Sequence, residues 1–131
     1  MNKGNYMKIL MSQKTKEYLR SNEYKKICMT RGKDRRISIF PKQKLGSLFS
    51  QERERAKMLK LFMPLVEADL ENDGYNMIEV SDELKNWAGV EDEFIIIGKP
   101  NRIEIWSKSN YNLHFKDNSE IIIEEGSINC D

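Results

Sequence analysis

The sequence RGKDRRISIFPK spans Arg31–Lys42, and a related stretch, IGKPNRIEIWSK, spans Ile97–Lys108. The second stretch begins 66 residues after the first, and the two share a Gly-Lys pair, an Arg-Ile pair, a second isoleucine, an aromatic residue and a lysine. The shared positions are Gly32 and Gly98, Lys33 and Lys99, Arg36 and Arg102, Ile37 and Ile103, Ile39 and Ile105, Phe40 and Trp106, and Lys42 and Lys108. A short element that occurs twice in one small chain indicates an internal repeat.

Each copy has the pattern of a β-hairpin. In the second copy, an apolar run from Phe94 to Ile97 is followed by alternating apolar residues at Ile103 and Ile105. The segment Gly98-Lys99-Pro100-Asn101 between them is typical of a turn, because glycine permits positive φ and proline fixes its own φ. The first copy alternates in the same way at Ile27, Met29, Ile37 and Ile39, around Gly32-Lys33-Asp34-Arg35. Both stretches are therefore predicted to be hairpins.

A short helix is predicted before each hairpin. In SDELKNWAGV, Ser81 is an N-cap candidate, two acidic residues occupy the first turn, and Gly89 ends the helix. At the same 66-residue spacing, TKEYLRSNEY places Thr15 against Ser81. The repeated unit is then a strand, a helix, a hairpin and a second short helix. Between the copies, residues 66–80 read as strand, turn and strand.

The repeat predicts the fold. A unit this small cannot bury both faces of its hairpin alone, but two copies packed about a pseudo-twofold axis can share one core and close a barrel. We therefore expect an α+β protein, mainly β, in which Arg36 and Arg102 lie in related surroundings. The predicted parts are a first unit at 1–50, a connecting helix at 51–64, a second unit at 65–115 and an acidic tail at 116–131. The one apolar run of the tail, Ile121–Ile123, could add an edge strand or cover a groove.

The net charge of +1 hides a strong asymmetry between the halves. Residues 1–62 hold 17 Lys and Arg against 5 Asp and Glu, which gives +12, and residues 63–131 hold 5 against 16, which gives −11. A basic half of this size suggests contact with nucleic acid. Alternatively, the two halves neutralise each other, within one molecule or between neighbours packed head to tail, and a head-to-tail contact closes into a ring or continues as a filament.

Two stretches carry a resemblance to a known family. WAGVEDEFIIIGKPNRIEIWSKSNY, at Trp87–Tyr111, and MTRGKDRRISIFP, at Met29–Pro41, resemble the second and first hairpins of the MraZ family of bacterial transcription regulators, which belongs to the AbrB-like swapped-hairpin proteins. The resemblance covers about residues 1–111. It implies tandem AbrB-like units that form a pseudo-twofold double-split barrel with short helices, assembly into a ring of subunits, and binding to the promoter of a cell-division and cell-wall gene cluster. It implies no metal site and no catalytic activity.

The sequence departs from the family where DNA contact is expected. Each unit of the family normally carries a D-x-x-G-R turn whose arginine contacts DNA. Depending on the alignment, Met77 or Tyr75 takes that place in the second copy, and Lys8 takes it in the first. Lysine lacks the planar fork that lets arginine bind guanine, so specificity should suffer more than general affinity. The candidate DNA-binding residues are Lys3, Lys8, Lys14, Lys16, Tyr75 and Asn76.

No motif points to an enzyme, a cofactor or a metal. The one histidine, His114, has no Cys or His partner at ligand spacing, Cys28 and Cys130 form no C-x-x-C pair and read as reduced thiols, and phosphate-loop and nucleophile motifs are absent. No apolar run approaches the roughly 20 residues of a membrane span, and the N-terminal segment has no signal-peptide core. We expect a cytoplasmic, nucleoid-associated protein without a cofactor, whose partners are double-stranded DNA and copies of itself, with no membrane and no small-molecule substrate.

A second hypothesis retains the predicted fold but assigns it no DNA binding. The motif arginines are missing, and the N-terminal segment enters its helix without room for the full first hairpin of the family. Both departures would also suit an oligomeric interaction module, or an antitoxin-like partner of another protein.

Overall fold

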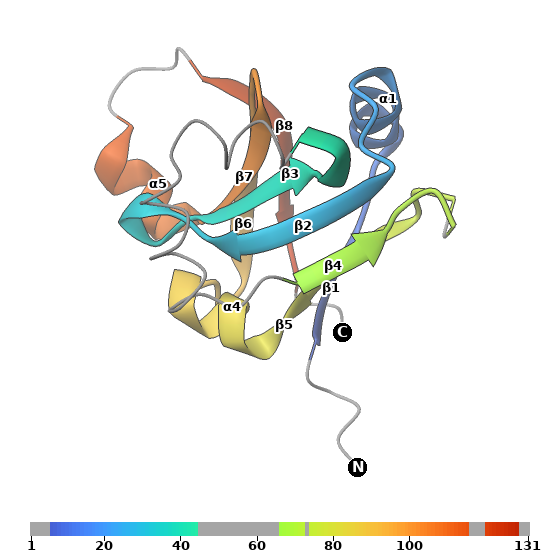
Figure 1. Cartoon of the computed structure of the whole chain (residues 1–131). Helices are drawn as coiled ribbons and strands as arrows, with labels where there is room; N and C mark the ends of the chain where they lie inside the picture. Colours follow the sequence, from blue (N-terminus) through green and yellow to red (C-terminus); the bar gives the residue numbers. More distant parts are fainter. Residues whose placement is uncertain (1–5, 45–65, 73, 116–119, 129–131) are drawn as a thin grey trace.

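The computed structural model describes residues 6–44, 66–72, 74–115 and 120–128 (Figure 1). The elements are β1 (Tyr6–Leu10), α1 (Gln13–Ser21), β2 (Lys26–Arg31), the 3₁₀ turn η1 (Lys33–Arg35), β3 (Ile37–Pro41), the 3₁₀ turn η2 (Lys42–Lys44), β4 (Val66–Asp69), β5 (Met77–Ser81), α4 (Asp82–Ala88), β6 (Glu93–Lys99), β7 (Arg102–Ser107), α5 (Lys108–His114) and β8 (Ile121–Ser127). Strands dominate and the helices are short, as expected of an α+β, mainly β protein. The connecting helix predicted at 51–64 lies outside the described residues.

The strands form two antiparallel sheets. One has six strands in the order β4-β2-β3-β7-β6-β8, and the other is a two-stranded ribbon of β1 and β5. Side chains from the ribbon, from α1 and α4 and from one face of the six-stranded sheet make a single hydrophobic core, which includes Ile9, Leu19, Ile78, Leu84 and Ile105. On the other face of the sheet, α5 covers β6 and β7, where Trp106 and Tyr111 pack together.

The pairing of β3 with β7 reveals an approximate dyad. Ser38 lies opposite Glu104, its own equivalent at the 66-residue spacing, and the neighbouring isoleucines exchange partners symmetrically on either side. The paired isoleucines are Ile37 with Ile105 and Ile39 with Ile103. Arg36 and Arg102 both contact Glu104, so they lie in related surroundings as the repeat predicts.

The helices break the 66-residue spacing. α1 begins after Ser12, whose side chain accepts a hydrogen bond from the Thr15 amide, and α4 begins after Ser81, which caps the helix in the same way. The two caps are 69 residues apart, and the ribbon pairs Ile9 with Ile78 at that same spacing. The alignment of Thr15 with Ser81 is therefore wrong: α1 starts three residues, nearly one helical turn, earlier.

The repeated glycines serve close packing and not positive φ. Gly32 has an extended backbone with φ −114°, Gly98 lies within β6, and neither has a positive φ. A side chain at Gly98 would collide with the hydroxyl of Tyr18 on α1, and one at Gly32 would collide with the hydroxyl of Ser38. Positive φ occurs instead at Asp34 and its neighbour in the first hairpin turn. The interpretation of Gly98 as a turn residue with positive φ was thus wrong.

The closed barrel is also wrong for the described strands. The ribbon shares no ladder hydrogen bonds with the six-stranded sheet, whose edges are β4 and β8. Residues 66–80 do contain two strands, but β4 pairs with β2 and β5 pairs with β1, because the turn between them sends the chain from one sheet to the other. The apolar run of the tail becomes the edge strand β8, which pairs with β6.

Candidate nucleic-acid interface

The predicted lysines lie on β1 and α1. Lys8 is exposed on the outward face of β1 and stands directly opposite Glu79 of β5 in the ribbon. Lys14 is exposed and Lys16 is half-buried on α1, while Lys3 lies outside the described residues. Because residues directly opposite on paired strands have Cβ atoms about 5 Å apart, Glu79 offsets much of the charge of Lys8. The two lysines of α1 are therefore the stronger candidates for contact with phosphate.

The turn before β5, at residues 74–76, lies next to the end of β1 and to α1. The Met11 amide, at the end of β1, donates a hydrogen bond of 3.0 Å to the carbonyl of Asn76, whose side chain is exposed. The guanidinium of Arg20, in the last turn of α1, lies 4.9 Å from the centroid of the Tyr75 ring. These contacts bring three segments together, namely the end of β1, helix α1 and the turn at 74–76.

Tyr75 itself is a core residue. It is only 6% exposed and belongs to the main hydrophobic cluster, and burial raises the pKa of its hydroxyl. Its backbone has φ 60°, an uncommon value for a bulky residue, and its amide donates to the carbonyl of Leu70 at 2.9 Å. The ring of Tyr75 faces the core and Arg20 covers its outer side, so little of it is open to DNA, and its assignment as a DNA-binding residue stays a prediction.

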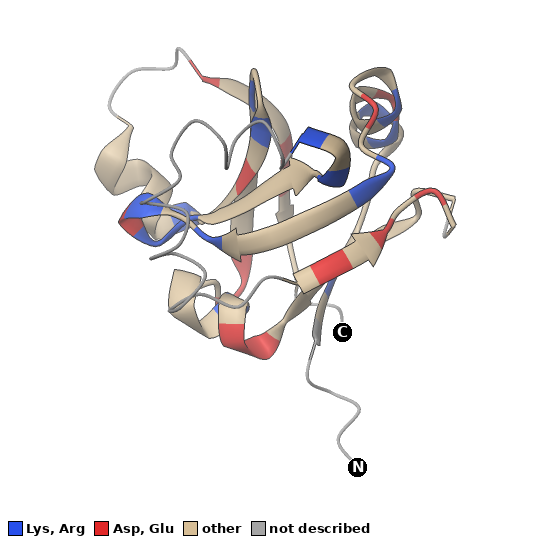
Figure 2. Cartoon of the chain, in the orientation of Figure 1, with Lys and Arg blue, Asp and Glu red and all other residues tan. Residues whose placement is uncertain are grey.

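Arg20 is the residue that sequence reasoning missed. It follows Lys16 by four positions, so the two side chains share one face of α1, and this spacing was the available signal. The distribution of charge differs between the two helices that the repeat relates: α1 carries three cations, Lys14, Lys16 and Arg20, against the one acid Glu17, whereas α4 carries two acids in its first turn against the one cation Lys85 (Figure 2). The basic surface therefore belongs to one half of the molecule.

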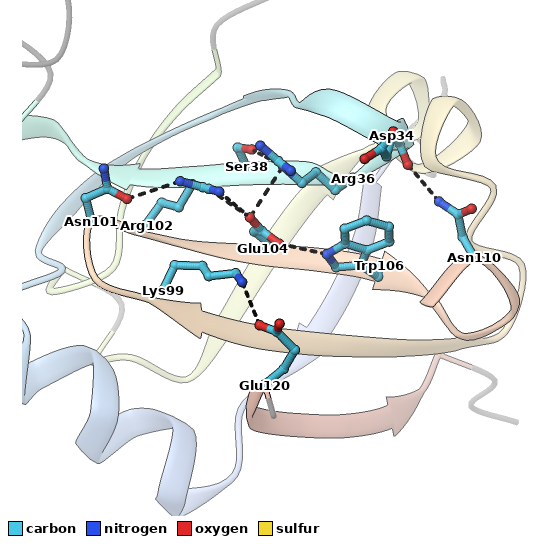
Figure 3. Close-up of polar contacts among 10 residues, drawn as sticks. All are labelled: Asp34, Arg36, Ser38, Lys99, Asn101, Arg102, Glu104, Trp106, Asn110 and Glu120. Atoms are coloured by element: carbon cyan, nitrogen blue, oxygen red, sulfur yellow. Dashed lines mark hydrogen bonds and ion pairs between the residues drawn. The ribbon is translucent and has the colours of Figure 1, made fainter. Parts of the chain in front are cut away.

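A buried ion cluster lies at the dyad, between β3 and β7 (Figure 3). Glu104 is 1% exposed, and its Oε2 accepts from Arg102 Nε at 2.8 Å and lies 3.4 Å from Arg36 Nε. Its Oε1 accepts from the indole nitrogen of Trp106 at 2.9 Å. Burial lowers the pKa of Arg36, and the charge of Glu104 opposes that effect. One carboxylate thus serves both repeated arginines, which explains why the equivalent position carries only Ser38.

A second carboxylate fixes the start of α1. Glu124 of β8 accepts hydrogen bonds through Oε1 from the Ser12 hydroxyl at 2.8 Å, from the Ser12 amide at 3.4 Å and from the Thr15 hydroxyl. A carboxylate is favoured there because the first amides of a helix carry partial positive charge. The acidic tail strand therefore holds the helix that bears the basic side chains.

Replacing Glu124 with glutamine is expected to lower the free energy of unfolding by about 1–2 kcal/mol, since hydrogen bonds to a charged group and the interaction with the helix end weaken together. Chemical denaturation of the full chain measures the change. Glu125→Gln is the matched control, because Glu125 is exposed and its one ion pair within the described segments is with Lys108 at 3.4 Å, and it should change stability by less than about 0.5 kcal/mol. Equal changes in the two variants would contradict the capping role.

An open groove of about 330 Å³ lies away from α1, between η1, α4 and α5. Arg35 donates to the carbonyl of Trp87 at 2.9 Å, and the guanidinium groups of Arg31 and Arg35 lie 5.7 Å and 5.6 Å from the centroid of the Trp87 ring. The side-chain amide of Asn110 donates to the carbonyl of Asp34 at 2.8 Å. Arg35, which lines the groove, and the nearby Arg31 are therefore both engaged with protein groups.

The described segments contain no group of three His, Cys, Asp or Glu side chains placed to hold a metal ion. Within those same segments, every helix is too short or too polar to cross a membrane.

Three known proteins similar to this chain are named transcriptional regulator MraZ. No protein-family model matches the chain. The transcriptional regulator MraZ of Syntrophomonas wolfei subsp. wolfei is 30% identical over 108 residues, which cover 76% of this chain and 73% of that protein. The proteins of the same name from Saccharopolyspora erythraea and Moorella thermoacetica are each 28% identical over 72% of this chain, and they are matched over 70% and 71% of their own lengths. The chain therefore belongs to the MraZ family, whose relatives named here are transcriptional regulators.

Proposed function

We propose that this protein is a DNA-binding transcription regulator of the MraZ type, built from two AbrB-like swapped-hairpin halves. The observation that carries the proposal is the similarity, over about three quarters of the chain, to a protein named transcriptional regulator MraZ. In this proposal the protein acts in the cytoplasm at the nucleoid, on the promoter of a cell-division and cell-wall gene cluster. It works as a ring-like assembly of identical chains, without a cofactor or a small-molecule substrate, and it is not an enzyme.

The surface formed by α1, β1 and the turn at 74–76 suits phosphate contact. Lys14 is exposed, and Lys16 and Arg20 lie on one side of the same helix. Lysines and arginines of this kind neutralise phosphates and release counterions, which makes affinity fall steeply with salt. A single chain supplies few such contacts, but copies linked in one assembly raise the effective concentration of the next contact and multiply weak affinities.

One observation favours an interaction module instead. Three cations of the basic half form ion pairs with acids of the other half, namely Arg31 with Glu83, Arg36 with Glu104 and Lys42 with Glu67. Part of the basic half is thus neutralised internally, as expected if the charge asymmetry serves folding or assembly. Whether Lys14 and Lys16 of α1 contact DNA distinguishes the DNA-binding regulator from the interaction module.

A fluorescence-anisotropy titration tests the proposal. The full chain is titrated against a labelled duplex from upstream of the division gene cluster, and against a scrambled duplex of the same composition, at three salt concentrations. We expect tighter binding to the upstream duplex and a linear fall of log affinity with log salt. Equal affinity for both duplexes, or no binding at low salt, would favour the interaction module.

A further inference from the structure

Arg20 differs from the other arginines of the described segments in its surroundings. Four of them are engaged by hydrogen bonds to protein groups: Arg31 to Glu83, Arg35 to the Trp87 carbonyl, and Arg36 and Arg102 within the Glu104 cluster. For the side chain of Arg20, which is exposed, the one contact found among the described residues is with the ring of Tyr75. A guanidinium that contacts a ring and makes no hydrogen bond has its N–H donors available to a ligand.

The platform beneath Arg20 is rigid. Tyr75 is buried, its backbone is held in the left-handed region, and its amide is bound to the Leu70 carbonyl. A bulky residue in that conformation is strained, and such strain persists only where the surroundings fix it. The ring therefore holds the guanidinium 4.9 Å above it at little entropic penalty for binding.

The neighbourhood contains both attractive and repulsive charges. Lys16 lies one helical turn before Arg20, and Asn76 follows Tyr75 with an exposed amide side chain. Glu71 and Asp69 are also close enough to act on the Tyr75 hydroxyl. These two acids disfavour a phosphate next to the ring, whereas the edge of a base carries no net charge. The position therefore suits a planar, hydrogen-bonding partner better than a backbone phosphate.

We propose that Arg20, held on the Tyr75 ring, contacts a base edge in DNA and supplies the sequence discrimination of this surface, with guanine as its partner. The O6 and N7 atoms of guanine match the guanidinium fork. Arg20 would then contact DNA from α1, next to the segment in which uncharged Tyr75 or Met77 takes the place of the motif arginine. This inference rests on the proposed DNA-binding function and adds the residue on which its specificity depends.

Selection from a pool of duplexes with a random core tests the inference. The full chain is compared with Arg20→Ala, Arg20→Lys and the control Lys33→Ala, an exposed cation of η1. We expect the wild type and the control to enrich the same motif. Arg20→Ala should bind that motif roughly 5- to 150-fold more weakly and lose the preference at one guanine, while its affinity for random DNA changes little. Arg20→Lys should likewise keep the random-DNA affinity and lose the guanine preference, because lysine retains the charge but lacks the planar fork.

The outcomes separate the inference from the function. If Arg20→Ala or Arg20→Lys enriches the wild-type motif with wild-type affinity, the inference is overturned and DNA binding stands. If the wild-type chain enriches no motif, the proposed function fails first, and the inference fails with it. Tyr75→Phe and Tyr75→Leu test the platform: Phe keeps the ring and should keep the motif, whereas Leu should lose the guanine preference although Arg20 is intact. Equal motifs for these two variants would contradict the role of the ring.

Discussion

Replacing Glu104 with serine is expected to lower the free energy of unfolding by about 3 kcal/mol. Breaking a buried ion pair by removing one partner typically costs 3–5 kcal/mol, because the remaining charge is left uncompensated. The lower end applies, since the side chains of Arg36 and Arg102 are 20% and 24% exposed and keep some contact with water. Trp106 also loses the acceptor for its indole nitrogen. Urea denaturation of the purified chain measures the difference.

The dyad makes this prediction sharper. Ser38 occupies the position equivalent to Glu104 and faces it across the β3–β7 pair. Adding Ser38→Glu to Glu104→Ser should therefore return a carboxylate to both arginines and recover at least half of the lost stability. Recovery should be incomplete, because the indole of Trp106 has no equivalent partner in the first copy, where Phe40 stands. A double variant no more stable than Glu104→Ser would show that the two positions are not interchangeable.

Reversing the two charges at the start of α1 is expected to weaken DNA binding by about 30-fold or more at about 0.15 M salt. Each phosphate contact contributes about 0.9 to the slope of log affinity against log salt, so the loss of two contacts should lower the slope by about 2. The variant is Lys14→Glu with Lys16→Glu, and anisotropy titrations at several salt concentrations give both quantities. Both side chains are exposed or half-buried on α1, so the fold should tolerate the change.

The matched control carries the same change of charge elsewhere. Lys33→Glu with Lys85→Glu alters η1 and α4, which lie away from α1 (Figure 1). General electrostatic repulsion of DNA would weaken both double variants alike. A specific role for α1 predicts a much larger loss, and a lower salt slope, for the α1 variant alone. Equal losses would remove the reason to place the contact on this helix.

The repeat in the sequence predicted the most about the fold. Hairpin pairing follows from local alternation of apolar residues and from turn residues, and the Ser81 cap and the Gly89 end of α4 follow from side-chain and backbone preferences of single residues. The relation between Arg36 and Arg102 was also predictable, because identical short elements that share a core tend to pair symmetrically. The hairpins and helix ends were predictable because they depend on residues close in the sequence, and the relation of Arg36 to Arg102 because the sequence repeats them.

Other features depend on contacts between distant segments, and the sequence carried no sign of them. Gly98 is small because Tyr18 of α1 packs against it, and no local turn pattern could indicate that. Tyr75 was assigned to the surface by alignment to a motif, but its burial depends on how the 74–76 turn meets α1. Tail residue Glu124 caps a helix more than 100 positions away. The lysines on α1 remain a prediction from charge, and what only the folded chain shows is the contact of the neighbouring Arg20 with the Tyr75 ring.

Hydrogen–deuterium exchange of the full chain, with and without a duplex enriched by the selection, tests the central claim most directly. The account predicts slower exchange on binding at the end of β1, along α1 and in the turn at 74–76, where DNA would cover the backbone. Residues 33–35, α4 and the beginning of α5 should exchange as in the free protein. Protection confined to the groove between η1, α4 and α5, or unchanged exchange throughout α1, would contradict the proposed interface.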